Sequence, residues 1–259
     1  MSRADGLVDL GTGWDSHAVL VDGTWVERTA RRPDSEPWLR TETQLLPWLA
    51  PRLPLPVPQP TVIGEDPLVI RHRLLPGRPC PDPDHDQAQA VARFLRALHD
   101  VPLDDAVARG VPDAATTRGW RRDAVARFHA EVLPRLPARA RRRIAAALER
   151  LDDAPPMVLV HGDLRDEHVL VDDHGVVSGV IDWSDTRAGD AAKDLAWLLR
   201  DPRLADTVAE AYGEDHAARA ADWDAVGPCY AVTHGLDTGD EDLVAHAVAQ
   251  LAAVGSRHP

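Results

Sequence analysis

The chain has 259 residues, of which 44% are hydrophobic and 27% charged, which excludes a disordered or fibrous protein and suits one large domain or two small lobes. Its 42 acidic residues outnumber its 29 basic residues, and the net charge of −13 argues against nucleic acid or an anionic membrane as a partner. Cys80 and Cys229 lack the spacing of a zinc site or a redox pair, and residues 1–10 lack the apolar core of a signal peptide. We therefore expect a cytoplasmic monomer.

The first third of the chain predicts a small sheet and one helix. The turn signal Asp22-Gly23 separates two apolar runs and indicates a hairpin. Leucines at helical spacing predict a helix at 36–49, which Pro47 should bend or end. Strands are predicted at 8–10, 17–21, 25–29, 61–63 and 68–73.

A proline-rich stretch after Leu74-Leu75-Pro76-Gly77 marks the boundary between two lobes. We expect an N-terminal lobe at 1–77 and a C-terminal lobe at 78–259, in which helices dominate. Helices are predicted at 86–98, 120–133 and 139–151, and from 190 to the end, with strands at 157–160, 169–171 and 176–181.

Polar residues follow two of these strands where they leave the apolar interior. The strand at 157–160 runs into His161-Gly162-Asp163-Leu164, with His168 five residues beyond Asp163, and Asp182 ends the strand at 176–181. Phosphoryl transfer needs a carboxylate that accepts a hydroxyl proton and two ligands that hold Mg²⁺ against nucleotide phosphates. We assign Asp163 as the base and His168 and Asp182 as the metal ligands.

These residues, with Gly189-Asp190 and Asp194, resemble the antibiotic phosphotransferases that have a protein-kinase-like fold. The resemblance covers nearly the whole chain and implies an α+β fold, with a small antiparallel-sheet lobe that binds nucleotide and a mostly helical lobe. It is closer to the macrolide 2'-phosphotransferases than to the aminoglycoside kinases, most of which have Asn in place of His168. The further features that carry it are Trp183, the Arg31-Arg32-Pro33 loop and residues 53–58.

The resemblance also implies supporting roles around the catalytic loop. We expect His161 to fix the loop rather than take part in chemistry, and Asp190 to accept hydrogen bonds from backbone N–H groups of the catalytic loop. Asp194 is expected to anchor a helix and a loop.

The nucleotide would lie against the first lobe. Gly13 and Ser16 belong to a glycine-containing turn that can cover phosphates, although a plain hairpin is its other interpretation. Lys193 is the only lysine, so Arg28 is the candidate for the phosphate-binding cation on the third strand, with Glu42 as its partner. The alternatives are a solvated arginine and an exposed helix acid.

The strand at 68–73 and the residue after it should bind the nucleotide base. Backbone groups of Ile70, His72 and Leu74 are the candidates for these hydrogen bonds. The resemblance implies GTP as the phosphoryl donor, with ATP as the alternative.

The acceptor would lie between Asp163 and the C-terminal helices. Residues available for contact there are Trp197, Trp223, Tyr230, His234 and Asp237, although helix aromatics are more often core residues. Our first choice is a macrolide, and the alternatives are an aminoglycoside, a cationic peptide antibiotic or an endogenous alcohol. The acidic cluster at 237–242 keeps the aminoglycoside alternative open, because several ammonium groups would need several carboxylates. A pseudokinase that only senses nucleotide would lack the base or a metal ligand, and all three are present.

Overall fold

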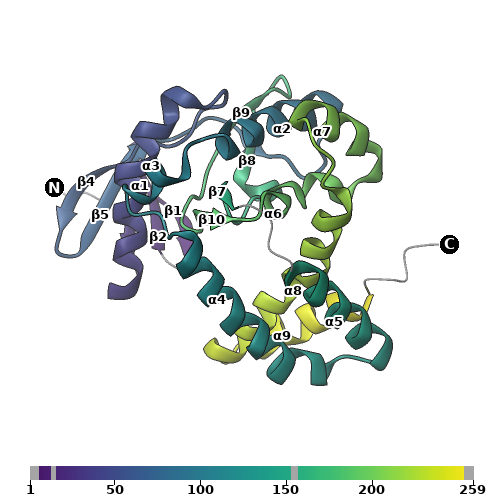
Figure 1. Ribbon diagram of the computed structural model, residues 1–259. Coiled ribbons are helices and arrows are strands. Elements are labelled where there is room, and N and C mark those ends of the chain that lie inside the picture. The colour runs from purple at the N-terminus through teal and green to yellow at the C-terminus, as the bar shows by residue number, and fades with distance from the viewer. Residues whose placement is uncertain (1–5, 13–15, 153–156, 254–259) are drawn as a thin grey trace.

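The computed structural model describes residues 6–12, 16–152 and 157–253 (Figure 1). Its N-terminal part is a five-stranded antiparallel sheet in the order β1-β2-β3-β5-β4. The strands are β1 Leu7–Thr12, β2 Ser16–Val21, β3 Trp25–Ala30, β4 Thr61–Glu65 and β5 Leu68–Arg73.

Left-handed backbone occurs at two places in the first three strands. Asp22 and Gly23 have φ values of 51° and 63° in the three-residue connection between β2 and β3, where the Thr24 N–H donates to the Val21 carbonyl at 3.1 Å. Gly11 has φ of 112°, and its N–H donates to the Asp9 carboxylate at 2.8 Å beside an irregularity in the β1–β2 register. The predicted strands are therefore confirmed.

Helix α1, Glu36–Leu49, joins the sheet to the rest of the molecule. Its buried face carries Leu39 against the sheet and Leu45, Leu46 and Leu49 in the main core. Pro47 does not end the helix, because it lies in the last turn, and the chain continues into a 3-10 turn at Ala50–Arg52.

Short strands in the second half hold two loops in place. β6, Arg78–Pro79, pairs with β8, Val169–Val171, which pairs with β9, Val177–Val180. β7, Val158–Val160, pairs with β10, Arg187–Gly189. The loops after β7 and β9 carry the predicted catalytic residues.

Helices make up most of the second half. The helix predicted at 120–133 begins earlier, because Asp113 caps it by accepting from the Thr116 N–H, and it ends in a π-helical segment at Phe128–Val132. The helices are α2 His85–His99, α3 Leu103–Val107, α4 Ala114–Arg127, α5 Ala138–Asp152, α6 Ala191–Leu195, α7 Ala205–Tyr212, α8 Ala217–Thr238 and α9 Glu241–Ala253.

Two large apolar clusters form most of the core, and two small ones lie under the N-terminal sheet and between α6 and α8. The larger one joins α1 and α2 to the short strands and α7, and the second packs α5 against α8 and α9. Figure 1 shows α5, α8 and α9 gathered at the end of the molecule away from the five-stranded sheet. Among the described residues, no helix has the length and apolar character needed to cross a membrane.

Candidate functional site

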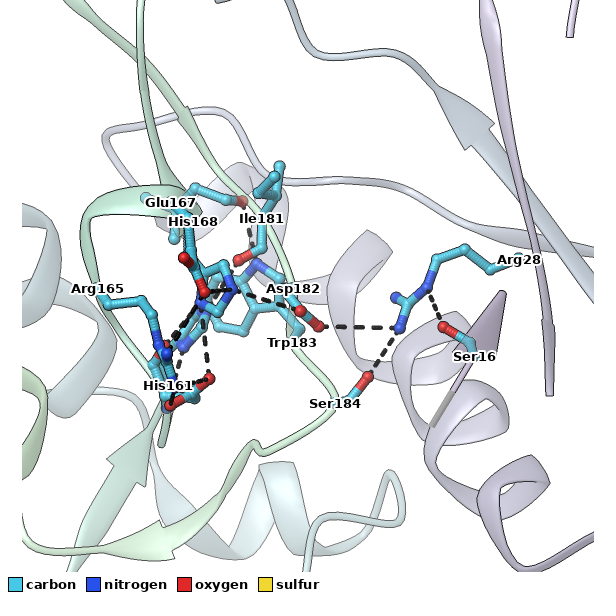
Figure 2. Close-up of polar contacts among 12 residues, drawn as sticks. Ser16, Arg28, His161, Arg165, Glu167, His168, Ile181, Asp182, Trp183 and Ser184 are labelled. Atoms are coloured by element: carbon cyan, nitrogen blue, oxygen red, sulfur yellow. Dashed lines mark hydrogen bonds and ion pairs between the residues drawn. The ribbon is translucent and has the colours of Figure 1, made fainter. Parts of the chain in front are cut away.

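The candidate site gathers residues from the loops after β7 and β9 and from the N-terminal sheet. Figure 2 shows His161 and His168 on one side of Asp182, with Arg28 on the other. The distance between these residues in the sequence is large, so the site exists only in the folded chain.

His161 ties the two loops together. Its Nε2–H donates to the Ile181 carbonyl at 3.0 Å, and its Nδ1 accepts from the Asp163 N–H at 3.3 Å. These bonds require the neutral ring, and burial lowers the pKa of His161 in agreement with them. Gly162 beside it has φ of 88°, and a side chain there would strike the Asp185 carbonyl. His161 is therefore a loop-fixing residue, as predicted.

Asp194 accepts hydrogen bonds from the backbone of the catalytic loop. It is fully buried, and its two oxygens accept from the N–H groups of His161 at 2.7 Å and Gly162 at 2.8 Å. Burial opposes its ionisation, but the hydrogen bond and charge of His99 hold the pKa of Asp194 below its usual value. The carboxylate thus fixes the backbone just before Asp163.

Asp190 does not hold the catalytic loop, which corrects the sequence-based expectation. One of its oxygens accepts from the Ala192 N–H and caps α6, while the other accepts from Arg219 at 2.6 Å and the Trp223 ring N–H at 2.7 Å. Asp190 lies beyond β10, so its carboxylate reaches α6 and α8 instead. Asp194, one turn later, reaches the loop.

Asp163, His168 and Asp182 lie together. His168 Nδ1 donates to the Asp163 carbonyl at 2.7 Å, which leaves Nε2 facing Asp182 Oδ2 at 3.4 Å. A ring oriented in this way can present Nε2 to a metal beside a carboxylate. Over the parts of the chain that the structure describes, no group of three or more metal-ligating side chains occurs. Two protein ligands fit Mg²⁺, which usually takes its other ligands from phosphates and water.

Arg165 is a site residue that the sequence analysis missed. Its NH2 group donates to both oxygens of Asp163, at 2.8 and 3.1 Å, and its NH1 lies 3.4 Å from Glu167. Its position two residues after the predicted base was the only available signal.

Arg28 is the centre of a polar network between the two lobes (Figure 2). Its NH1 donates to both oxygens of Glu42 at 2.9 and 2.7 Å, and its Nε donates to Ser16 at 3.0 Å. Its NH2 donates to Ser184 at 2.8 Å and lies 3.8 Å from Asp182. The predicted pairing of Arg28 with Glu42 is therefore present, and Ser184 is a member that the sequence did not reveal.

Glu42 is buried, so its charge depends on its partners. Burial raises the pKa of Glu42, whereas the charge of Arg28 and a hydrogen bond from Ser184 lower it. Neither Arg28 nor Glu42 is an exposed, solvated residue, which excludes the alternatives for both.

The predicted contact of Ile70 with the nucleotide base needs correction, and so does a contact through the Leu74 N–H, whereas a backbone contact of His72 stays a prediction. Ile70 lies in the sheet interior, where β5 pairs with β3 and β4, so its backbone groups belong to the ladder. The Leu74 N–H donates to the Thr24 carbonyl at 2.8 Å. His72 is buried opposite Val26 on β3, and burial lowers the pKa of its ring. Gly13 lies outside the described residues.

Several side chains that were predicted to contact the acceptor already have partners within the protein. Trp197 is only 6% exposed and packs in the main core, so it does not line a site. Asp237 is held by Arg127 at 3.0 and 2.9 Å, one turn after His234 on α8. Asp240 caps α9 by accepting from the Leu243 N–H, whereas Glu241 lines a second cavity of about 490 Å³ whose other lining residues are mostly apolar. Tyr230 is partly buried and packs edge-on against Phe128, with ring centroids 4.9 Å apart, beside the second core cluster.

A cavity of about 210 Å³ opens beside the loop that follows Asp182. The rings of Trp38 and Trp120 form one wall, with their centroids 5.7 Å apart, and residues 184–187 form the other. Aromatic walls next to polar loop atoms suit a largely apolar ligand.

Comparisons with known proteins identify the family of the chain. A family model described as a phosphotransferase enzyme family matches residues 7–229. The viomycin phosphotransferase of Streptomyces vinaceus is 31% identical over 182 residues, 65% of this chain and 59% of that protein, which is less than two thirds of its length.

Solved structures show the same fold. The GDP complex of aminoglycoside 2'-phosphotransferase-IIIa has a TM-score of 0.83 at 24% identity, over 95% of this chain and 91% of that one. Macrolide 2'-phosphotransferase from Brachybacterium faecium has a TM-score of 0.74 at 27% identity, over 98% and 92%. The predicted kinase-like fold, an antiparallel sheet followed by a mostly helical part, is confirmed.

Proposed function

The chain belongs to the phosphotransferase enzyme family, and from that premise we propose that it transfers the γ-phosphoryl group of GTP to a hydroxyl of a macrolide antibiotic. The observation that carries the proposal is the convergence on Asp182, where His168 Nε2 lies at 3.4 Å and the Arg28 guanidinium at 3.8 Å. A metal-ligand pair beside a fixed cation is what nucleotide phosphates require. In this proposal residues 1–77 form the nucleotide-binding lobe and 78–259 the lobe that binds the acceptor.

Asp163 is the base in this proposal. Its carboxylate accepts the proton of the acceptor hydroxyl while that oxygen forms a bond to the γ-phosphorus, and the bond from that phosphorus to the bridging oxygen breaks to release GDP. Asp194 and His161 fix the backbone on which Asp163 stands, so the carboxylate needs little rearrangement. Arg165 holds the carboxylate in place before a hydroxyl approaches.

His168 and Asp182 would hold Mg²⁺, which supplies positive charge to orient and neutralise the nucleotide phosphates. Arg28 adds a second, permanent positive charge on the sheet side, and Glu42 and Ser16 fix its position. The GTP preference rests on the family resemblance, and GDP occurs in the complex of the aminoglycoside relative named above.

The macrolide is supported by His168, by Trp183 and by the aromatic cavity beside the site. The macrolide is also supported by the aspartates near the site, because their carboxylates already form ion pairs with arginines. Asp185 pairs with Arg187 at 2.7 Å, Asp190 with Arg219, and Asp237 with Arg127. An aminoglycoside carries several ammonium groups and would need carboxylates that are not already neutralised.

The test is to incubate the protein with Mg²⁺, GTP or ATP, and an erythromycin-like macrolide or kanamycin, followed by mass spectrometry. We expect a macrolide product heavier by one phosphoryl group with GTP, and unchanged kanamycin. In the control variant Asp163→Asn, turnover should fall roughly 100-fold or more while GTP binding persists, because only base assistance is lost. Phosphorylated kanamycin with unchanged macrolide would refute the substrate assignment, and normal turnover of Asp163→Asn would refute the base.

A second candidate acceptor is a cationic peptide antibiotic. The specific observation in its favour is the 31% identity to the viomycin phosphotransferase. Viomycin therefore belongs in the same assay, and its phosphorylation in place of the macrolide would make this the function.

A further inference from the structure

Lys193 is the only lysine in the chain, and it lies on α6 immediately behind the catalytic loop. α6 packs against β7 on one side and against α8 on the other (Figure 1). Asp163 and Asp185 are among the charges that act on the Lys193 ammonium, which places it within electrostatic reach of the base. The proposed mechanism gives this residue no role.

Two aromatic rings of α8 surround the Lys193 ammonium. Its Nζ lies 5.8 Å from the ring centroid of Trp223 and 5.6 Å from that of Tyr230, within range of a cation–π interaction. Over the described part of the chain, no carboxylate forms an ion pair or hydrogen bond with this Nζ. Lys193 therefore has ring partners and retains N–H donors for a ligand.

A second cation approaches the same ring from α4. The Arg121 guanidinium lies 4.5 Å from the Trp223 centroid, and its NH2 group is buried without a hydrogen-bond partner among the described residues. A buried, unpaired N–H donor is unfavourable unless something accepts its hydrogen bond. Arg121 thus also points to a missing acceptor atom.

The acids near these two cations already have partners. Asp185 accepts from Arg187 at 2.7 Å, and Asp190 accepts from Arg219 at 2.6 Å and from Trp223. The wall between α4, α6 and α8 therefore carries an excess of positive charge, in a protein whose net charge is −13.

We infer that Lys193, Arg121, Trp223 and Tyr230 form an acceptor subsite that binds a carbonyl-bearing, apolar part of the antibiotic and excludes polycations. The inference deepens the proposed function and rests on it. Both cations can only donate hydrogen bonds, so they select an oxygen acceptor, while the two rings select the apolar surface around it. A macrolide lactone has both features, whereas kanamycin or viomycin would bring ammonium groups against like charge.

The single lysine makes a direct binding experiment possible. Reductive methylation with ¹³C-formaldehyde keeps the charge and labels one ε-amine, which NMR distinguishes from the α-amine of the chain. We would titrate the labelled protein, with GDP and Mg²⁺ present, against an erythromycin-like macrolide, kanamycin and viomycin. The Lys193 signal should shift and saturate with the macrolide only.

Kinetics of matched variants complete the test. Lys193→Met should raise the KM for the macrolide about tenfold with kcat within about threefold, and Lys193→Glu should improve the relative use of kanamycin. The controls are Arg203→Met and Arg203→Glu, because the side chain of Arg203 is 85% exposed and, among the described residues, forms an ion pair with Asp201 alone. Both controls should behave like the unmodified protein.

The outcomes separate the subsite from the proposed function. A saturable macrolide shift without phosphoryl transfer would keep the subsite and reject the proposed activity. If the macrolide is phosphorylated but the chemical shift of the Lys193 signal does not change, and the KM of Lys193→Met is unchanged, the subsite alone would be rejected. A saturable shift with kanamycin or viomycin would overturn the exclusion of polycations.

Discussion

At the scale of single residues, each buried carboxylate of the site is matched to a particular basic partner. Glu42 has Arg28, and Asp194 has His99 at 3.2 Å. Removing one partner of such a pair would leave the other charge buried and uncompensated. The acidic surplus of the composition therefore does not produce an acidic pocket at the site.

Asp182 and His168 should affect metal dependence to different degrees. Asp182→Ala should raise the Mg²⁺ concentration for half-maximal rate at least tenfold or abolish activity, because a charged oxygen ligand is lost. His168→Asn should be milder, since an amide oxygen can also bind Mg²⁺. The measurement is a Mg²⁺ titration of initial rate at saturating GTP.

The matched control is Glu167→Ala. Glu167 Oε1 lies 3.8 Å from His168 Nε2, farther than Asp182 Oδ2 at 3.4 Å, and its side chain is 58% exposed and pairs with Arg165. Its Mg²⁺ dependence should equal that of the unchanged protein. Unchanged Mg²⁺ dependence in both Asp182→Ala and His168→Asn would exclude the two residues as the metal ligands.

The role of a residue could be predicted where a sequence motif determines which residues surround it. It could not be predicted where the contact joins segments that are far apart in the sequence. His161-Gly162-Asp163 and the pairing of Arg28 with Glu42 could be predicted, because loop geometry and strand order determine them. Ser184 could not, since it meets Arg28 across 156 positions of sequence. The expectation for Asp194, an anchor for a loop, agrees with the structure, whereas that for Asp190 was wrong, because one helical turn decides which segment each carboxylate reaches.

At the scale of elements, the site depends on where β3 and α1 place their polar side chains. Arg28 lies opposite Ile70 in the sheet, so both side chains are on the face that α1 covers, where Ile70 packs with Leu39 and Arg28 contacts Glu42. Hydrophobic periodicity was enough to predict that these strands and helices exist. It did not predict where α4 begins, because that depends on the Asp113 cap. The depth of Ile70 in the sheet required knowledge of which strands flank β5.

Arg28 and Glu42 should act as one unit. Arg28→Ala should lower kcat/KM for GTP roughly 100-fold, because it removes the charge next to the phosphates, and Glu42→Ala should lower it roughly tenfold through lost positioning. The double variant should be little worse than Arg28→Ala, with a coupling energy of about 1–3 kcal/mol. Steady-state kinetics of the four proteins measure this.

The pair Glu27–Arg71 provides the matched control for that cycle. It joins β3 to β5 beside Arg28, with Arg71 Nε 2.9 Å from Glu27, but it does not reach Asp182. Alanine at either position should leave the kinetics with GTP nearly unchanged. Additive losses for Arg28 and Glu42 would instead mean that the two side chains act separately.

At the scale of the whole molecule, the composition has a marked preference for arginine, and this shapes both the site and its stability. With one lysine among 29 basic residues, almost every cation is permanently charged and can form two-pronged contacts. Lys193 is the exception, and it lies among rings rather than beside a carboxylate. Burial, together with the charge of Arg187, lowers the pKa of Lys193 to about 8.

Lys193 should therefore reduce the free energy of unfolding at neutral pH. Below pH 8 the folded protein holds the ammonium in an unfavourable place, so Lys193→Met should be more stable by roughly 1–3 kcal/mol. Between about pH 8 and the ordinary lysine value of 10.5, the folded protein has released its proton while the unfolded chain still binds one. The stability of the unchanged protein should then rise relative to Lys193→Met, and the difference should close toward pH 10.5. Urea unfolding from pH 7 to pH 10, with Arg203→Met as the exposed control, measures that difference. Greater stability of the unchanged protein at pH 7 would show that ring contacts outweigh burial at Lys193.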